Sequence, residues 1–227
     1  MRLSNILVPS VMGIGALAQD NVTGKLGDAP VEYSERYLRG LEAMAVLPHT
    51  PFFTSGALHD NVKGSVKVSI GAESAGTEFE VTFSNLPKEG GPFTYHLHVE
   101  PVDDSGNCTK TLAHLDPFIR GEDPPCNPAR PETCQVGDLS GKYGKITSDP
   151  FKAKFRDPFT TMEGGPGSFF LNRSVVVHFA NKTRITCANF NVTRAPDRDP
   201  DSAASKFGGS VFSVALLVAA MAMALTL

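Results

Sequence analysis

The feature that most constrains the fold is a series of short segments in which apolar and polar residues alternate. On a β-strand such alternation sends one set of side chains to each face, so that one face can be buried. Glycine, proline and aspartate separate the segments, as in turns. The segments are residues 62–70, 77–83, 93–99, 146–155, 168–178 and 184–192. We therefore predict an all-β fold, an antiparallel Greek-key β-barrel or sandwich of immunoglobulin-like type with long loops.

Both ends of the 227-residue chain have the composition of processing signals. Residues 1–18 combine a basic start, an apolar stretch and small residues, which is typical of a secretory signal peptide. Residues 203–227 contain a long apolar stretch that follows small residues and a polar spacer, which is typical of the signal for a glycosylphosphatidylinositol (GPI) anchor. We expect Ser202 to carry the anchor. A permanent tail anchor is the alternative, although about 17 apolar residues are few for a membrane span.

Between these signals the sequence predicts one β domain with a short segment on either side. We expect an N-terminal extension at residues 19–40, the domain at 41–194 and a stalk with proline and aspartate at 195–202. The domain is long enough to bury a core of its own. Residues 41–47 also alternate, which fits a further strand, although residues 33–44 fit a helix equally well.

Charge and glycosylation motifs agree with a surface protein. The net charge of −3 is close to neutral and excludes nucleic acid as an expected partner. Five Asn-x-Ser/Thr motifs are acceptors for N-glycosylation on the secretory route. They begin at Asn21, Asn107, Asn172, Asn181 and Asn191.

The four cysteines predict two disulfides in an oxidising compartment, and three pairings are open. Cys126 and Cys134 flank a Pro-rich loop, where a local bridge fits. That pairing would leave Cys108 and Cys187 to close a long loop, which is worth about 4 kcal/mol in the chain-entropy model.

Four of the six histidines are candidates for a metal site. His96 and His98 flank one leucine in a predicted strand, so their side chains share a face about 7 Å apart. His178 ends a β-branched run, and His114 lies in a predicted loop. Imidazole nitrogen suits copper, zinc, iron or nickel. The alternative is that these are ordinary surface histidines, but a pair two residues apart on one strand favours a metal.

Five short motifs follow one another along the chain. They are His96-Leu97-His98, Cys108 with His114 six residues later, Gln135-Val-Gly-Asp138-Leu, Val175-Val-Val-His178, and Arg184 three residues before Cys187. In this order they resemble the copper–zinc superoxide dismutase family, and more closely its fungal extracellular copper-only branch. The resemblance covers about residues 62–190 and implies the β-barrel of that family.

The resemblance implies one copper ion per chain, with His96, His98, His114 and His178 as ligands. The implied activity is the conversion of superoxide to dioxygen and hydrogen peroxide, which needs a redox-active ion and not zinc. Arg184 would attract the anion through its permanent charge. On reduction, His114 would leave copper and carry a proton.

One departure from the zinc-binding members implies that no zinc is bound. Residues 115–134 contain no histidine, and Gln135 stands where those members have their last zinc histidine. Only His114 and Asp138 remain of a set that usually numbers four. Gln135 and Asp138 become candidates to orient His114 from behind.

A second departure implies an open copper site. Only five residues separate His178 from Arg184, whereas typical members carry a long charged loop there that narrows the approach to copper. The family's bridged cysteines match Cys108 and Cys187. Their bridge would hold the loop of His114 against the strand of Arg184.

These observations predict a secreted enzyme held at the cell surface by a GPI anchor, in the plasma membrane or the cell wall. Its expected partners are superoxide, the membrane lipid and cell-wall glucan. The alternative is a copper-binding or structural cell-wall protein that keeps the dismutase fold without catalysis.

Overall fold

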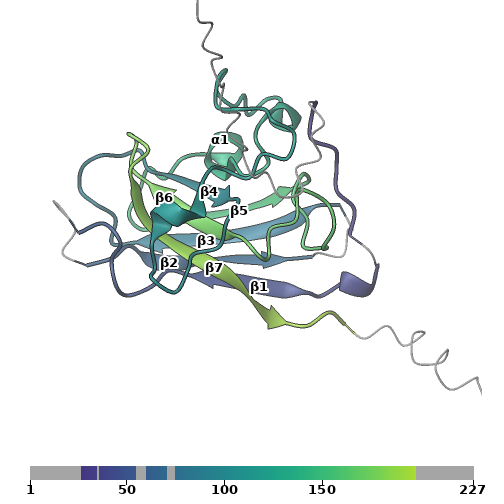
Figure 1. Ribbon diagram of the computed structural model, residues 1–227, viewed down its shortest axis with the longest axis horizontal. Coiled ribbons are helices and arrows are strands. Elements are labelled where there is room, and N and C mark those ends of the chain that lie inside the picture. Colours follow the sequence, from purple (N-terminus) through teal and green to yellow (C-terminus); the bar gives the residue numbers. More distant parts are fainter. Residues whose placement is uncertain (1–26, 35, 55–59, 71–74, 198–227) are drawn as a thin grey trace, which may run out of the picture.

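The computed structural model describes residues 27–34, 36–54, 60–70 and 75–197. Within these ranges the chain forms one curled antiparallel sheet in the order β4-β6-β7-β1-β2-β3-β5 (Figure 1). The all-β antiparallel prediction is confirmed. The strands are β1 (Glu42–Val46), β2 (Lys63–Ser69), β3 (Thr77–Ser84), β4 (Thr94–His98), β5 (Phe151–Asp157), β6 (Ser174–His178) and β7 (Arg184–Arg194).

The alternating pattern is reproduced as alternating burial. On β3, Phe79, Val81 and Phe83 are buried while the residues between them face outward. The ring of Phe79 stacks on Phe155 from β5 at 5.3 Å and on Phe170 at 5.6 Å. Burying aromatic side chains of this size contributes much of the stability of a small β domain. The core therefore lies inside the curl of the sheet.

The structure decides one open alternative and shifts two predicted strand starts. Glu42–Val46 form strand β1, and the rival helix is reduced to one 3-10 turn, η1 (Arg36–Leu38). Strand β5 begins only at Phe151, since Pro150 has no N–H to extend the ladder. Strand β6 begins only at Ser174, because Phe170 bonds instead to the carbonyl of Thr161.

The long connection from β4 to β5 covers the outer edge of β4. It contains η2 (Cys108–Thr111), η3 (Pro131–Thr133) and α1 (Leu139–Tyr143), and lies over the sheet (Figure 1). Leu97 of β4 donates its N–H to the Gly137 carbonyl at 2.9 Å and accepts from Leu115 at 2.8 Å. A Cβ on Gly137 would lie 2.4 Å from the Leu97 carbonyl oxygen, so this close approach requires glycine. The connection thereby satisfies backbone groups that an edge strand would leave open.

A buried ion pair fixes α1 to the sheet. Lys142 of α1 pairs with Asp157 at the end of β5, and both side chains are fully buried. Lys142 also donates to the Val136 carbonyl at 2.9 Å, and Asp157 accepts from the Phe159 N–H at 2.8 Å. Removing one partner of such a pair leaves an uncompensated charge in the core.

The predicted terminal signals, 1–18 and 203–227, lie outside the described residues, as do Asn21 and Ser202. Among the residues that the structure describes, no helix has the length and apolar character needed to cross a membrane.

We expect Lys142→Met to lower the free energy of unfolding by about 3–5 kcal/mol, because the Asp157 carboxylate stays buried without its counter-ion. Urea denaturation measures this. The double variant Lys142→Met/Asp157→Leu should recover most of the loss. Lys154→Met, which breaks the exposed pair with Glu80, is the matched control and should leave stability almost unchanged. A loss under about 1 kcal/mol for Lys142→Met would show that the pair does not hold α1.

Candidate metal centre

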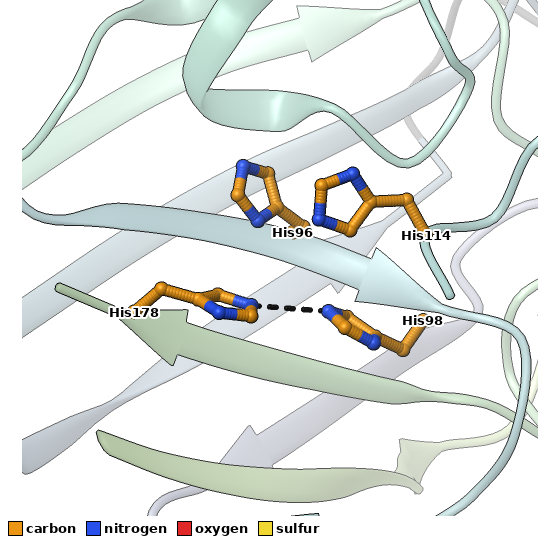
Figure 2. A group of neighbouring side chains, drawn as sticks. All are labelled: His96, His98, His114 and His178. Carbon is orange, nitrogen blue, oxygen red and sulfur yellow. Dashed lines mark hydrogen bonds between the residues drawn. The ribbon is translucent and has the colours of Figure 1, made fainter. Parts of the chain in front are cut away.

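Four histidines from three segments meet beside strand β4. The strand carries His96 and His98, its neighbour β6 ends on His178, and the loop after η2 carries His114. Their candidate ligand nitrogens all lie within 4.8 Å of one another. Figure 2 shows the four rings turned toward one another, with His98 and His178 joined by the dashed line. The structure thus brings together all four histidines that the sequence singled out.

The position of His178 depends on a bulge and a tight turn. The register between β6 and β7 shifts between Val177 and His178, and such bulges re-aim a side chain next to a site. The turn that follows closes with a hydrogen bond from Phe179 N–H to the Thr183 carbonyl at 2.9 Å. Lys182 adopts the left-handed region there, with φ of 70°. Because the turn is short, the backbone carbonyl of Lys182 lies next to the ring of His178.

Backbone carbonyls orient His98 and His178. Nδ1 of His98 lies 2.9 Å from the Leu112 carbonyl, and Nδ1 of His178 lies 3.0 Å from the Lys182 carbonyl. A carbonyl only accepts, so each Nδ1 carries the proton and each Nε2 carries a lone pair. The two Nε2 atoms face each other at 3.1 Å. Two lone pairs cannot bond to one another, but both can bind a shared cation.

Side chains orient the other two rings: Gln135 faces His114, whereas Asp138, which was also expected to orient His114, faces His96 instead. Nδ1 of His114 lies 2.8 Å from Oε1 of Gln135, and Nε2 of His96 lies 3.4 Å from the Asp138 carboxylate. These oxygens only accept, so His114 presents the lone pair of Nε2 and His96 that of Nδ1. Nδ1 of His96 is buried without a hydrogen-bond partner in the described part of the chain. Four lone pairs therefore converge, one of them on an orphaned buried atom.

Burial keeps His98, His114 and His178 neutral in the absence of metal. It lowers the pKa of His114 to about 4 and that of His178 to about 3, with a further lowering from the charge of His96. The pKa of His98 is also far below its usual value, chiefly through burial. Burial acts to raise the pKa of Asp138, but the hydrogen bond and charge of His96 outweigh it and lower that pKa. At neutral pH the lone pairs are therefore available.

The donor set fits a transition metal that prefers nitrogen ligands. Four imidazoles with no thiolate and no directly facing carboxylate suit copper or zinc far better than magnesium or calcium, which prefer oxygen. The acceptors behind the rings are the outer partners that metal-bound histidines usually have.

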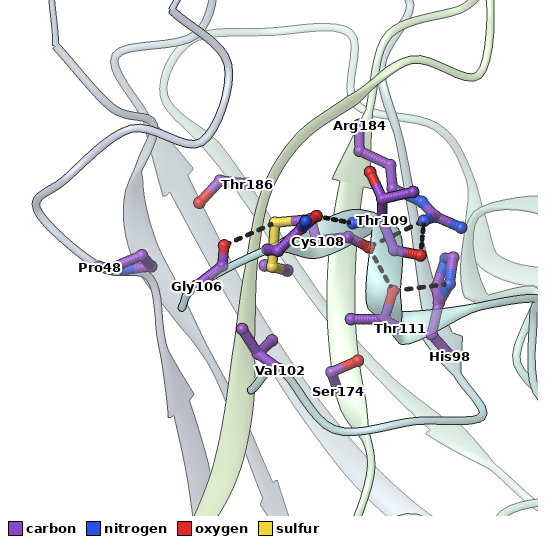
Figure 3. The surroundings of a disulfide bond; sticks show 12 residues. Pro48, His98, Val102, Gly106, Cys108, Thr109, Thr111, Ser174, Arg184 and Thr186 are labelled. Atoms are coloured by element: carbon purple, nitrogen blue, oxygen red, sulfur yellow. Dashed lines mark hydrogen bonds between the residues drawn. A yellow bond between two sulfur atoms is a disulfide. The ribbon is translucent and has the colours of Figure 1, made fainter. Parts of the chain in front are cut away.

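The same loop holds Arg184 and His98 (Figure 3). The guanidinium of Arg184 donates to the Cys108 carbonyl at 2.9 Å, to the Thr109 carbonyl at 2.7 Å and also to the Leu112 carbonyl. The Leu112 carbonyl is the one that holds His98. One loop thus fixes an arginine and a candidate ligand together.

Both disulfides are present. Cys108 is bridged to Cys187, which ties η2 to strand β7 three residues after Arg184. Thr111 of η2 donates to the Cys108 carbonyl at 2.8 Å, and its hydroxyl lies 3.2 Å from Nδ1 of His98. Cys126 and Cys134 form the local bridge.

A cavity of about 460 Å³ opens beside the four rings. His96, His114 and His178 line it, so small molecules in solvent can reach three of the candidate ligands. Lys182 and Glu122 form an ion pair from opposite loops that also line it.

Reasoning from sequence missed several partners of the site. The carbonyls of Leu112 and Lys182 carry no sequence signal, since every residue has a carbonyl. Asp116, which bonds to Gln135, lies two residues after His114 and could have been considered for that reason. Of the glycosylation motifs, Asn172, Asn181 and Asn191 are exposed, whereas Asn107 is half-buried and caps η2.

Comparison with known proteins places these features in context. No family model matches the chain. It is 34% identical to "Cell surface Cu-only superoxide dismutase" of Arthroderma benhamiae over 86% of this chain and 56% of that protein. It is 33% identical to "Cell surface Cu-only superoxide dismutase 5" of Candida albicans over 58% of this chain and 56% of that protein. The chain therefore spans little more than half the length of these two relatives.

Solved structures give the same result for the fold. The Cu(II) form of superoxide dismutase 5 of Candida albicans superposes with a TM-score of 0.58 and 28% identity, covering 70% of this chain and 96% of that one. A mutant of the same protein gives a TM-score of 0.59 and 29% identity, covering 71% and 97%.

Proposed function

The chain belongs to the copper–zinc superoxide dismutase family, in its fungal cell-surface copper-only branch, and we propose that it is a copper-dependent superoxide dismutase of the cell surface. The observation that carries the proposal is the convergence of four imidazoles, each oriented by a partner that only accepts hydrogen bonds. The folded protein therefore orients the candidate ligands without a bound metal.

Four residues would hold the ion: His96, His98, His114 and His178. Bound copper supplies one-electron chemistry, in which one superoxide is oxidised to dioxygen and a second is reduced, with two protons, to hydrogen peroxide. Of the chain's own groups, His114 lines the cavity and its Nε2 can hold or release a proton, while Gln135 bonds to Nδ1 on the other side of the ring.

Arg184 would attract and position the anion. Three bonds to carbonyls use three of its five N–H donors and fix the guanidinium in place. Because a guanidinium is always charged, its attraction for an anion does not vary with pH. Its bonds go to backbone carbonyls, so Arg184 would act on the anion through its charge.

We further propose that no second site, for zinc, forms beside the copper site. The residues matching a zinc set are already engaged, since Gln135 bonds to His114, and Asp138 both bonds to His96 and caps α1 through the Gly141 N–H. A neutral amide is a poor ligand for zinc, which prefers nitrogen, sulfur or carboxylate donors.

The domain boundaries, anchor and glycans complete the proposal. We assign a signal peptide to 1–18, an extension to 19–40, the enzyme domain to 41–194, a stalk to 195–202 and a removed GPI signal to 203–227. Cell-wall glucan is a second partner beside the membrane lipid. The exposed Asn172, Asn181 and Asn191 are proposed to carry glycans.

The secreted protein should contain about one copper and negligible zinc per chain, and should accelerate the decay of superoxide. His178→Ala should lose both copper and activity, because Nε2 of His178 is one of the two facing lone pairs. Metal analysis beside a superoxide assay measures both. His49→Ala, which changes an exposed histidine outside the site, is the control. Copper binding without turnover would favour the non-catalytic copper protein, and no metal at all would favour the structural one.

Arg184→Glu should slow turnover per bound copper and change its dependence on ionic strength, since a screened attraction is replaced by repulsion. Steady-state rates between about 0.01 and 0.3 M salt test this. Lys154→Glu makes the same charge change on β5, at the opposite edge of the sheet from β4, and should have little effect. Equal rates and salt profiles for Arg184→Glu and the unmodified protein would contradict this role.

A phospholipase specific for phosphatidylinositol should release the protein from intact cells if a GPI lipid holds it. Replacing Ser202 by a bulky residue should reduce surface retention, because the attachment position needs a small side chain. Immunodetection of released and retained protein measures this. Protein that stays with the membrane after treatment would favour a permanent tail anchor.

A further inference from the structure

The amide of Gln135 lies between a candidate copper ligand and a carboxylate. On one side its Oε1 is 2.8 Å from Nδ1 of His114, and on the other its Nε2 is 3.1 Å from Oδ2 of Asp116. Gln135 is buried, with 8% of its surface exposed, so water does not readily replace either bond. His114, Gln135 and Asp116 thus form a chain of hydrogen bonds, called the relay below, that leads away from the candidate metal site.

The direction of this relay is set by Asp116. Its carboxylate has no hydrogen to donate and also accepts the N–H groups of Arg120 at 2.9 Å and Gly121 at 2.8 Å. Those two bonds hold the carboxylate in the loop. The only group of Gln135 that can bond to it is the NH₂, so the amide oxygen must face His114. Nδ1 of His114 must then donate, and its Nε2 keeps the lone pair for the metal.

An amide needs a second residue to fix which of its two ends faces His114, whereas a carboxylate does not, because its two oxygens are equivalent. A glutamine turned by 180° would present its NH₂ to Nδ1 of His114, and the ring would respond by moving its proton to Nε2. In that form Nε2 cannot bind a metal. A carboxylate at position 135 accepts with either oxygen and would fix the same tautomer by itself. The neutral Gln135 therefore depends on a second residue.

We propose that Asp116 is a positioning residue for the copper site: acting through the Gln135 amide, it holds His114 in the Nδ1–H tautomer that presents Nε2 to the metal. This inference rests on the proposed function only in taking His114 as a ligand. Asp116 does not contact the ring itself, and it fixes the tautomer of His114 before copper binds. Its effect is therefore measurable in the metal-free protein, with no superoxide assay.

The first test uses the unmodified secreted protein after its copper has been chelated. Nitrogen-15 NMR of the imidazole rings should show a single Nδ1–H form for His114, and one NH₂ proton of Gln135 should exchange slowly with water. A His114 ring protonated on Nε2, or an equal mixture of the two forms, would overturn the proposal. This measurement needs no variant and does not depend on activity.

The second test breaks the relay and then restores it. Asp116→Ala should populate both tautomers of His114 and raise the dissociation constant for Cu(II) about tenfold, the lower end of the range for lost outer partners of a metal ligand. Asp116→Ala/Gln135→Glu has the net charge of the unmodified protein and supplies an oxygen that can only accept. It should restore the single tautomer and the affinity for Cu(II).

A purely structural role for Asp116 predicts a different result. If the residue mattered only for the loop through Arg120 and Gly121, the added Gln135→Glu would rescue nothing, and the proposal would fail. It would also fail if Asp116→Ala kept the single tautomer. Asp103→Ala, which removes an aspartate that holds the Asp103–Asn107 turn of the same β4–β5 connection, is the matched control and should leave His114 unchanged. Loss of activity with normal tautomers would instead bear on the proposed function.

Discussion

The four imidazoles can converge only because each is held from behind by an oxygen that accepts and never donates. Two of these oxygens are backbone carbonyls, of Leu112 and Lys182, and two are side-chain oxygens, of Gln135 and Asp138. If any one of them were a donor, the ring in front of it would turn its proton inward and repel the metal. The tautomers are therefore properties of the folded chain, and the site is organised before it is filled.

The fold supplies these acceptors by closing three segments around β4. The loop of His114 pairs with the edge of β4, the short turn after β6 returns to His178, and the Cys108–Cys187 bridge ties η2 to β7. A conformational change in one segment would move at least one acceptor. Cross-linking the η2 loop to β7 restricts such changes, because a covalent bond cannot separate as a hydrogen bond can.

How far sequence could predict this site depended on the kind of group involved. The spacing of His96 and His98 on a strand defined half of the ligands, and the motifs that resemble the family brought in His114, His178 and the bridged cysteines. The predicted strand starts at residues 146 and 168 were wrong by several residues, because alternation continues beyond the point where pairing stops, at Phe151 and Ser174. The Leu112 and Lys182 carbonyls were out of reach, since only the three-dimensional path of the backbone selects one carbonyl from the rest.

The amide at position 135 shows that a neutral group can orient a candidate ligand only with the help of a second residue. Here a neutral dipole stands behind His114, and a dipole has two orientations of opposite effect. Something must choose between them, and Asp116 can do so because its own orientation is already fixed by two backbone N–H groups. The orientation of His114 is thus set by the direction of hydrogen bonds, and this holds only while Gln135 stays buried.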